Sequence, residues 1–386
     1  MNDPIFKPTL SPYYTAEHKA FRDSVRAFVA REVEPFVDEW DEAGEFPRDL
    51  YHRAGEAGLL AVGFPEEYGG IPADAFMKII LNEELARAGS GGIIAGLLIH
   101  GIGAPPIVAM GSPELKQRVL PGILAGDKIC ALAVTEPSGG SDVANLRTKA
   151  KREGDHYVVN GSKMFITSGM RADYYTVAVR TGGEGMQGIS LLLVEKGTPG
   201  FSQTPLKKMG WWCSDTAALY FDDCRVPAEN LVGEENSGFY GIMNNFNSER
   251  FGLAGMSIGF AQVCLEESVA WARQRETFGK RLVDHQVIRH KIVDMAGRIN
   301  AARAFLENLA WRVGQGEKPV AELCMLKNIA TSCVEYCAGE AVQILGGAGF
   351  IRGNKVERIY RETKVLAIGG GSTEIMKDLA ARQMGL

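Results

Sequence analysis

The sequence predicts a multidomain α+β protein with an N-terminal helical domain (residues 1–126), a middle antiparallel β domain (127–232) and a C-terminal four-helix bundle (233–386). Apolar residues recur at helical spacing in the first and third segments, whereas they alternate with polar residues in the second. The chain of 386 residues is also long enough for two or three domains with sizeable cores.

Helix signals define the N-terminal domain. Phe21 begins one apolar helical stripe and Phe76 begins another, while Pro47 and Ser112 mark two helix starts. The segment Gly89–Ile107 is rich in glycine and alanine. Its small residues either allow helices to pack closely or leave room for the apolar tail of a ligand, and both interpretations stay open.

Alternation identifies the strands of the middle domain. A first strand over Ile129–Ala133 leads into a loop. The segment 157–166 predicts a β-hairpin that turns at Asn160-Gly161, because this dipeptide is favoured in two-residue turns. Three further alternating runs cover residues 174–179, 189–194 and 217–221.

Three long amphipathic helices and a short last one predict the C-terminal bundle. The first runs to Gly279, and the second, Asp284–Gly314, carries a continuous apolar stripe. The third covers Pro319–Leu345 and the last covers Ser372–Gln383, which together give the four helices of a bundle.

Composition excludes several function classes. The net charge of −5 and the lack of a basic run argue against nucleic acid as a partner. The seven cysteines are scattered without a Cys-x-x-Cys pair, which fits buried thiols in a reducing compartment, and no metal site is expected. Met1–Leu10 lacks the apolar core of a signal peptide, and the longest apolar run, Ile93–Ile99, is too short to span a bilayer. We therefore expect a soluble, cytoplasmic protein.

The loop after the first predicted strand carries the strongest functional signal. Residues 132–142 read Leu-Ala-Val-Thr-Glu-Pro-Ser-Gly-Gly-Ser-Asp. The glycines let backbone N–H groups approach a phosphate or a planar ring, and Thr135 and Ser141 add hydroxyls. An ordinary strand exit would explain the Gly-Gly turn alone, but it would not explain the whole string.

The string Thr-Glu-Pro-x-x-Gly-Ser-Asp at 135–142 resembles the signature of the acyl-CoA dehydrogenases, which are FAD enzymes that desaturate acyl-CoA thioesters. Matching segments recur in family order from about Glu17 to the C-terminus. The resemblance implies the acyl-CoA dehydrogenase fold, bound FAD, an acyl-CoA substrate and an electron-transfer flavoprotein as electron acceptor. It further implies a homotetramer and a role in fatty-acid or branched-chain acyl catabolism.

The resemblance also assigns residues to FAD. Phe165 matches an aromatic residue that covers the flavin, a tryptophan in many members, and the hydroxyl of Thr167 matches one that bonds near flavin N5. Arg275 matches an arginine that meets the pyrophosphate of FAD in a neighbouring subunit. The full set matched to the cofactor is Leu132, Val134, Thr135, Ser141, Phe165, Thr167, Arg275, Thr277, Phe278, Gln286, Gln343, Gly346, Gly347, Ser372 and Glu374.

The catalytic base departs from the commoner family pattern. Many members carry a glutamate in the last loop, where this chain has Gly370, which has no side chain and retains only a backbone N–H for the enolate oxygen. A subgroup that resembles the long-chain and isovaleryl enzymes takes its base from a bundle helix, and Asn247-Ser-Glu-Arg250 matches that motif. A helix carboxylate read alone is usually solvated, but the vacated loop position makes Glu249 the expected base.

The resemblance matches a further set of positions to the substrate and leaves its acyl chain open. Neither the length nor the branching of the acyl group follows from the sequence. The positions matched to substrate are Ser141, Asn247, Arg250, Gly371, Ile94 and Leu98.

Two other functions are compatible with parts of this pattern. An acyl-CoA oxidase or a flavin monooxygenase of the same fold would use oxygen, although oxidases are typically longer and monooxygenase relatives usually lack a base at either position. A non-catalytic scaffold would require neither the flavin loop, nor Arg275, nor a base. Glu249 therefore favours the dehydrogenase.

Overall fold

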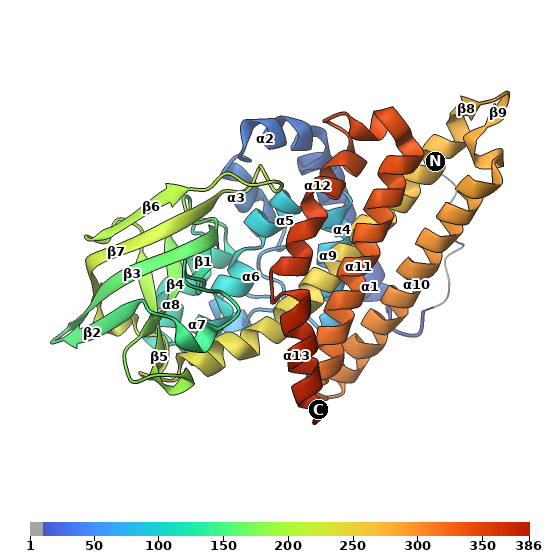
Figure 1. Ribbon diagram of the computed structural model, residues 1–386. Helices are drawn as coiled ribbons and strands as arrows, with labels where there is room; N and C mark the ends of the chain where they lie inside the picture. The colour runs from blue at the N-terminus through green and yellow to red at the C-terminus, as the bar shows by residue number, and fades with distance from the viewer. Residues whose placement is uncertain (1–10) are drawn as a thin grey trace. The chain divides into compact units, whose positions relative to one another are not determined.

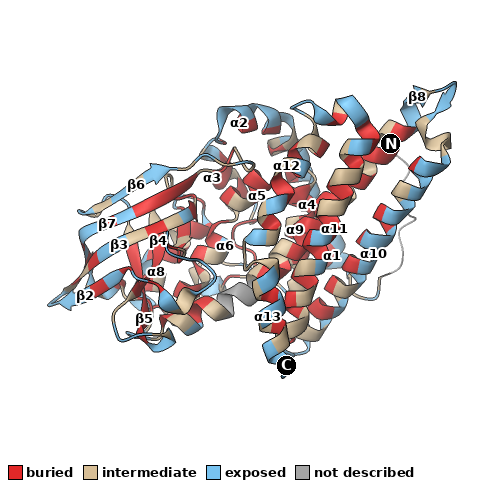
Figure 2. Ribbon diagram, viewed as in Figure 1, coloured by how far each residue is buried: buried red, intermediate tan, exposed pale blue. Residues whose placement is uncertain are grey.

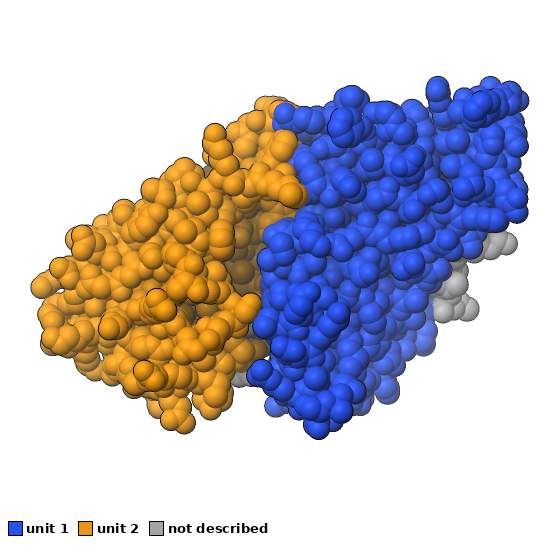
Figure 3. Space-filling view, in the orientation of Figure 1, with its two compact units in different colours: residues 1–38, 73–91, 250–386 blue, residues 39–72, 92–249 orange. Residues whose placement is uncertain are grey.

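The computed structural model describes residues 11–386, except for the side chains of residues 244–248. The chain forms two compact units, which Figure 3 shows in different colours. Unit 1 comprises Met1–Asp38, Ala73–Gly91 and Arg250–Leu386, and unit 2 comprises Glu39–Pro72 and Gly92–Glu249. The three domain ranges inferred from the sequence divide the chain differently and stay a prediction.

Unit 1 is almost entirely helical and is built around α11, which packs against α10, α12 and α13 (Figure 1). Buried side chains run along the whole of α11 (Figure 2), and Asn354 caps α12 by accepting a hydrogen bond from Val356 N at 2.8 Å. The structure adds α12 to the predicted helices, because charged residues separate its apolar ones. The helices are α1 Ala16–Glu32, α4 Ala75–Ala86, α9 Gly238–Gln274 from Arg250 onward, α10 Gln286–Gly314, α11 Val320–Leu345, α12 Lys355–Ile368 and α13 Thr373–Gln383.

Two carboxylates of α4 are buried against charged side chains of α1. Glu84 is 2% exposed and accepts hydrogen bonds from Arg22 at 2.7 Å and from Arg26 at 2.9 Å. Glu83 is 6% exposed and accepts a hydrogen bond from Arg22 at 3.0 Å. Burial acts to raise the pKa of Glu84, but Arg26 and Arg22 outweigh it, so the pKa of Glu84 is lowered. The ion pairs therefore tie α1 to α4 within unit 1.

The helices of unit 2 are short, and α8 begins at a capping residue that the sequence identifies. Ser112 caps α8 and accepts a hydrogen bond from Leu115 N at 3.1 Å, as its position before Pro113 predicts. Gly58, after α3, has a φ of 73° and ends that helix in the left-handed conformation. The helices are α2 Val37–Ala43, α3 Asp49–Glu56, α5 Gly91–Leu97, α6 His100–Gly103, α7 Pro105–Met110 and α8 Pro113–Leu124.

Two small residues of α5 serve close packing. A Cβ at Gly92 would lie 2.7 Å from Cys213 Sγ, and a Cβ at Gly96 would lie 2.6 Å from Phe46 Cε1. Neither position could carry a larger side chain without displacing its neighbour. At these two glycines the structure therefore favours tight packing over free space for a ligand.

Unit 2 contains a seven-stranded sheet in the order β1-β4-β2-β3-β7-β6, with β5 also paired to β4. Most pairs are antiparallel, whereas β1 pairs with β4 in parallel and β2 meets β4 in parallel at Lys149 and Arg180. Residues 175–179 and 189–194 are buried throughout, so both faces of β4 and β5 are covered. The strands are β1 Cys130–Ala133, β2 Lys149–Glu153, β3 His156–Thr167, β4 Tyr174–Arg180, β5 Ile189–Glu195, β6 Phe201–Pro205 and β7 Thr216–Pro227.

The predicted hairpin turn at Asn160-Gly161 is wrong. β3 continues through this dipeptide and stays paired with β7, with a register shift beside Gly161. Gly161 has a φ of 146°, and a Cβ there would lie 2.7 Å from Thr148 Cα, so the glycine serves a bulge and a close backbone contact. The side-chain oxygen Oδ1 of Asn160 accepts a hydrogen bond from the backbone N–H of Asp223 of β7 at 2.9 Å. The real turn joins β2 to β3 at Gly154-Asp155.

Neither a membrane span nor a metal cluster stands out in the part of the chain that the structure describes. No single helix there has the length and apolar composition to cross a membrane, although α5 taken together with the stretch His100–Met110, bent by 49°, meets the test as a pair. Within the same described residues, no group of three or more His, Cys, Asp or Glu side chains is arranged to hold a metal ion.

The Glu84→Gln substitution should lower the free energy of unfolding at pH 7 by about 2 kcal/mol, because it removes the charge of a buried acceptor that bonds Arg22 and Arg26. The pKa of Glu84 is lowered on folding, so its contribution is complete above the unfolded pKa of about 4.3 and is lost as the pH falls through the folded value. In urea unfolding, the difference from wild type should therefore shrink below about pH 4. Asp23→Asn, on the exposed pair with Lys19, is the control and should change little. Equal effects of the two substitutions would contradict the prediction.

Candidate active site

A buried ion pair anchors the loop after β1. Glu136 is 4% exposed and Lys163 of β3 is fully buried; Lys163 Nζ donates to Glu136 Oε1 at 2.9 Å and to Val134 O at 3.0 Å. The carboxylate also accepts the backbone N–H groups of Arg147 at 2.6 Å and Thr148 at 2.9 Å. Because both oxygens are hydrogen-bonded, the buried carboxylate is compensated by groups that the fold places around it.

Burial and the attraction between the two charges shift the pKa of each group in opposite directions. Burial acts to raise the pKa of Glu136, but the Lys163 ammonium and the hydrogen bonds from Thr148 outweigh it and lower this pKa to about 2. Burial lowers the pKa of Lys163 to about 8, although Glu136 acts to raise it. Both groups are therefore predominantly charged at pH 7.

The tip of this loop faces solvent. Glu136 N donates to Gly139 O at 3.1 Å and Gly139 N donates to Glu136 O at 3.0 Å, which closes a tight turn. Residues 137–142 are exposed, and a Cβ at Gly140 would lie 3.0 Å from Thr135 Cγ2. The loop thus combines accessible backbone with the hydroxyls of Thr135 and Ser141, as the sequence predicts. Leu132 and Thr135 are half-buried, and Val134 is buried.

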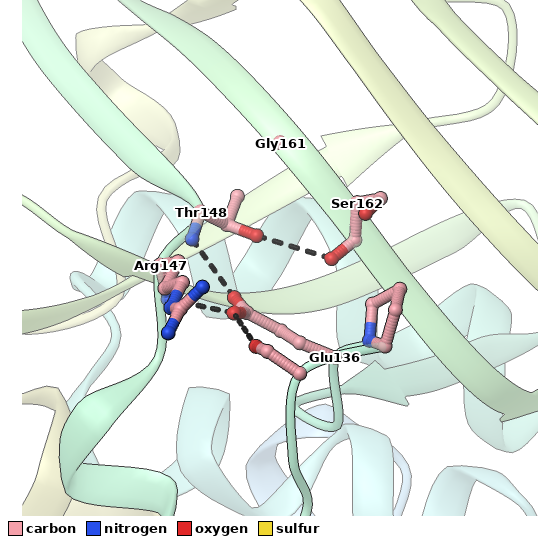
Figure 4. Close-up of a pocket in the computed structure, with 7 residues that line it drawn as sticks. Glu136, Arg147, Thr148, Gly161 and Ser162 are labelled. Carbon is pink, nitrogen blue, oxygen red and sulfur yellow. Dashed lines mark hydrogen bonds between the residues drawn. The ribbon is translucent and has the colours of Figure 1, made fainter.

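A pocket of about 210 Å³ lies beside the turn (Figure 4). Thr148 Oγ1 donates to Ser162 O at 3.2 Å within it. This volume is below the roughly 300–1,000 Å³ typical of sites that enclose a cofactor or drug-sized ligand, so the pocket by itself does not accommodate FAD. Its lining residues are Glu136, Pro137, Ser138, Arg147, Thr148, Gly161 and Ser162.

The end of β3 lies directly beside the loop. Met164 N donates to Thr135 O at 2.8 Å, which brings the segment Phe165–Thr167 next to the signature residues. The pairing of β3 with β7 slips over residues 163–166, and Phe165 has a φ of 62°. This bulge, and not strand alternation, sets the direction of the Phe165 side chain, which is 67% exposed. Thr167 is half-buried.

The segment after α9 is a projecting hairpin (Figure 1). The prediction that the helix runs to Gly279 is wrong, because α9 ends at Gln274 and β8 Glu276–Thr277 pairs with β9 Lys280–Arg281. Phe278 and Gly279 have φ values of 53° and 76°, the left-handed pair that a two-residue hairpin requires. Helical spacing gives no indication of such a turn.

Predicted FAD contacts gather on this hairpin and just after it. Arg275 and Gln286 are exposed, and the ring of Phe278 is 98% exposed. The Thr277 hydroxyl hydrogen-bonds with His285 Nε2 at 3.1 Å, which fixes the hairpin against the start of α10. These side chains are accessible to a ligand or to a second subunit.

The end of α11 carries the next predicted contacts. Gln343 is exposed, and Gly346 follows the helix with a φ of 61°. A Cβ at Gly346 or Gly347 would meet no atom within 4 Å, so the backbone is open on that side. Open backbone of this kind allows a ligand to approach closely.

The last loop is fixed by two side chains of α11. Gly370 and Gly371 have φ values of 64° and 98°, and the fully buried Lys327 donates through Nζ to Gly371 O at 2.7 Å. Asn328 Nδ2 donates to Thr373 O at 3.0 Å. Ser372 accepts from Ile375 N at 3.3 Å and caps α13. The exposed Glu374 lies in the first turn of α13.

The predicted base lies on α9. Glu249 is half-buried and is the last residue of unit 2, whereas the adjacent Arg250 is 4% exposed and belongs to unit 1, as does Gly370. The side chain of Asn247 lies outside the described residues.

Two further positions matched to substrate, Ile94 and Leu98, lie at α5 in unit 2. Ile94 is buried, 4% exposed, and Leu98 is half-buried one residue after the helix ends.

Comparison with known proteins is consistent with these features. Acyl-CoA dehydrogenase domain models match residues 15–127 (N-terminal domain), 131–224 (middle domain) and 236–385 (C-terminal domain). The chain belongs to the acyl-CoA dehydrogenase family. The order of a helical, a β and a helical segment is thereby confirmed.

Relatives cover nearly the whole chain. It is 38% identical to the long-chain specific mitochondrial acyl-CoA dehydrogenase of Rattus norvegicus, over 96% of this chain and 87% of the relative. A probable acyl-CoA dehydrogenase structure from Mycobacterium abscessus is 50% identical with a TM-score of 0.95 and covers 97% of this chain and 100% of its own. A glutaryl-CoA dehydrogenase of Mycobacterium smegmatis in complex with FADH2 is 27% identical with a TM-score of 0.91, over 97% and 96% of the two chains. This acyl-CoA dehydrogenase family member is therefore an oxidoreductase.

Two lysines that anchor loops of the candidate site were missed by sequence reasoning. Lys163 and Lys327 are both fully buried and both donate to site loops. A lysine within an apolar stretch was the available signal, as in Cys-Met-Leu-Lys-Asn-Ile-Ala at 324–330. Without the contacts, such a lysine is not distinguishable from one that extends its amine to solvent.

Glu136→Gln should lower the free energy of unfolding at pH 7 by about 3–5 kcal/mol, since it leaves the buried Lys163 cation unpaired. The folded pKa of Lys163 should then fall below its present value of about 8, while the unfolded pKa stays near 10.4. The folded variant then loses this proton at a lower pH than the folded wild type does, so the deficit should shrink as the pH rises to about 8 and stay constant above it. Urea unfolding between about pH 7 and 10 measures it.

Glu153→Gln is the matched control, because Glu153 forms a solvent-exposed ion pair with Lys151 on β2 of the same sheet, at 3.1 Å. This substitution should leave stability nearly unchanged. If Glu136→Gln behaved like this control, the ion pair would not be the anchor of the loop.

Proposed function

We propose that this chain is an FAD-dependent acyl-CoA dehydrogenase that introduces a trans-2 double bond into an acyl-CoA thioester. Its electrons would pass to an electron-transfer flavoprotein, in fatty-acid or branched-chain acyl catabolism. The observation that carries the proposal is the loop after β1, which the buried Glu136–Lys163 pair holds in place. The bond from Met164 N to Thr135 O brings this loop next to Phe165, whose ring is 67% exposed.

The donor set of unit 2 suits a flavin. An isoalloxazine ring needs an apolar or aromatic surface along one face and hydrogen-bond donors at its edge. Leu132, Val134 and the Phe165 ring supply the first, and Thr135, Ser141 and Thr167 supply the second. The glutaryl-CoA dehydrogenase structure with FADH2 supports the assignment by family likeness.

Unit 1 offers groups suited to the phosphates, ribose and adenine. The Arg275 guanidinium forms charge-assisted hydrogen bonds to phosphate, and the Thr277 hydroxyl and Gln286 amide suit sugar or phosphate oxygens. The open backbone at Gly346-Gly347 allows a planar base to lie against it, beside Gln343. Ser372 and Glu374 complete the proposed contacts with the cofactor.

The chemistry requires removal of a proton next to a thioester. We assign this proton to the Glu249 carboxylate, which is half-buried on α9. Charge that develops on the thioester oxygen needs a positioned donor, and the backbone N–H of Gly370 can serve because it does not depend on a side chain. Lys327 fixes the neighbouring Gly371 carbonyl and thereby the loop. When bound, FAD supplies the acceptor for the hydride that leaves the β-carbon.

The remaining proposed substrate contacts divide by the part of acyl-CoA that they meet. Ser141, Asn247, Arg250 and Gly371 would contact the thioester arm and its CoA portion. Ile94 and Leu98 would line the far end of the acyl tail, where both are apolar. Because the base is on a helix, the last loop can consist of small residues, which favours bulky, branched or long acyl chains.

We further propose that the functional form is a homotetramer. Arg275 and the almost fully exposed ring of Phe278 lie on a hairpin that projects from unit 1 (Figure 1), where a second subunit could cover them. Arg275 would then reach FAD of a neighbouring subunit, as the family pattern implies.

Purified protein should be yellow, and denaturation should release FAD. A panel of acyl-CoA thioesters of varied length and branching should bleach the bound flavin under anaerobic conditions, with enoyl-CoA as the product. An artificial one-electron acceptor should reoxidise the reduced enzyme faster than oxygen does. Release of FMN, or failure to take up added FAD, would contradict the cofactor, and rapid reoxidation by oxygen would favour an oxidase.

Glu249→Gln should slow flavin reduction by acyl-CoA roughly 10²–10⁴-fold in stopped-flow measurements, because it keeps the shape and removes the base. FAD and acyl-CoA should still bind. Glu374→Gln, the control, should mainly weaken FAD binding. Reduction of the Glu249→Gln variant at near wild-type rate would refute the assignment.

Adding Gly370→Glu to the Glu249→Gln variant should restore part of the rate, since both positions would address the same α-carbon. Gly370 has a φ of 64°, a conformation that costs other residues roughly 1–2 kcal/mol, so full recovery is not expected.

A further inference from the structure

The segment that would face the flavin is flanked by two left-handed residues. Phe165 has a φ of 62° and Ser168 has a φ of 58°, and Thr167 lies between them. Residues other than glycine adopt this conformation only when the surrounding structure imposes it. The direction of the Phe165 ring and the Thr167 hydroxyl therefore depends on whatever fixes the chain on both sides.

Asp215 makes the two contacts that fix this segment from its C-terminal side. Its backbone carbonyl accepts a hydrogen bond from Ser168 N at 2.9 Å. Its carboxylate Oδ2 accepts one from Met170 N at 2.6 Å, a short bond of the kind that a charged acceptor makes. The next residue, Thr216, pairs directly with Thr167 in the sheet. One residue thus constrains both the strained position and the turn after it.

Asp215 is the carboxylate among the side chains that hold the turn after Ser168, and Lys196 Nζ also contacts the turn by donating to Met170 O at 2.8 Å. Tyr175 Oη donates to Gly169 O at 2.9 Å and to Ala172 O at 3.0 Å, and a Cβ at Gly169 would lie 2.7 Å from Ala217 Cβ. Among the residues that the structure describes, Oδ1 of Asp215 is buried without a hydrogen-bond partner.

The charge of Asp215 is balanced by its surroundings only in part. Burial raises the pKa of Asp215, while the N–H of Met170 and the charges of Arg171 and Lys208 act to lower it. Lys208 itself is engaged by Thr216, since its Nζ donates to Oγ1 at 3.0 Å. A partly buried carboxylate with one unpaired oxygen is unfavourable for stability alone, which suggests a functional reason for its presence.

We propose that Asp215 is a positioning residue that sets the orientation of Phe165 and Thr167 toward the flavin. The inference rests on the proposed function, because it takes the segment Phe165–Thr167 to contact FAD. In this proposal Asp215 acts through the backbone of Ser168 and Met170.

The test compares FAD binding in three variants of the full-length protein. Asp215→Ala should raise the Kd for FAD roughly tenfold to a hundredfold, as expected for loss of a hydrogen bond to a charged acceptor. It should also shift the visible absorption bands of the bound flavin and its reduction potential. Asp215→Asn keeps an oxygen for Met170 N and should stay within about threefold of wild type. Asp222→Ala, an exposed position on the adjoining strand β7, is the control and should change nothing.

A second variant separates positioning from stability if Asp215→Ala folds poorly. Adding Ser168→Gly removes the cost of the left-handed conformation, so the melting temperature should recover. The flavin spectrum and potential should remain shifted, because glycine relieves strain without fixing direction. Wild-type spectrum, potential and Kd in either the single or the double variant would overturn the proposal. Failure of the wild-type protein itself to bind FAD would instead contradict the proposed function.

Discussion

The buried ion pair between Glu136 and Lys163 is the interaction on which the rest of the site depends. It takes two charges out of water, which is costly, and that cost is offset only because Val134, Arg147 and Thr148 supply further hydrogen bonds. The same contacts join the loop after β1 to β3 and to the start of β2. Any residue that the loop presents to a ligand therefore has its position set by this pair.

Backbone conformations that disfavour a side chain occur repeatedly at the proposed ligand contacts. Phe165, Phe278, Gly346 and Gly370 all have positive φ, and each lies in a segment matched to cofactor or substrate. Such conformations persist when neighbouring groups determine them. For the last loop this neighbour is Lys327 of α11, which donates to Gly371 O.

The errors of the sequence analysis have a common physical origin. Asn160-Gly161 has the composition of a hairpin turn, yet the glycine is needed because Thr148 approaches within 2.7 Å of where a Cβ would lie. Helical periodicity extended α9 to Gly279, but the turn at Phe278-Gly279 depends on left-handed backbone that spacing does not encode. In both cases local composition was compatible with two conformations, and contacts with another segment selected one.

The sequence by itself determined the order of helical and β segments and the family. It also determined that the position of the common catalytic glutamate is a glycine, Gly370, and that a carboxylate is present at Glu249. These features follow from residue identity and from periodicity along the chain, so no tertiary structure is needed to infer them. Only the tertiary structure decided that Lys163 and Lys327 are buried donors, that Phe165 lies on a bulge, and that Asp215 bonds to Met170. Burial and hydrogen bonding join residues far apart in the chain, so their partners cannot be read from local pattern.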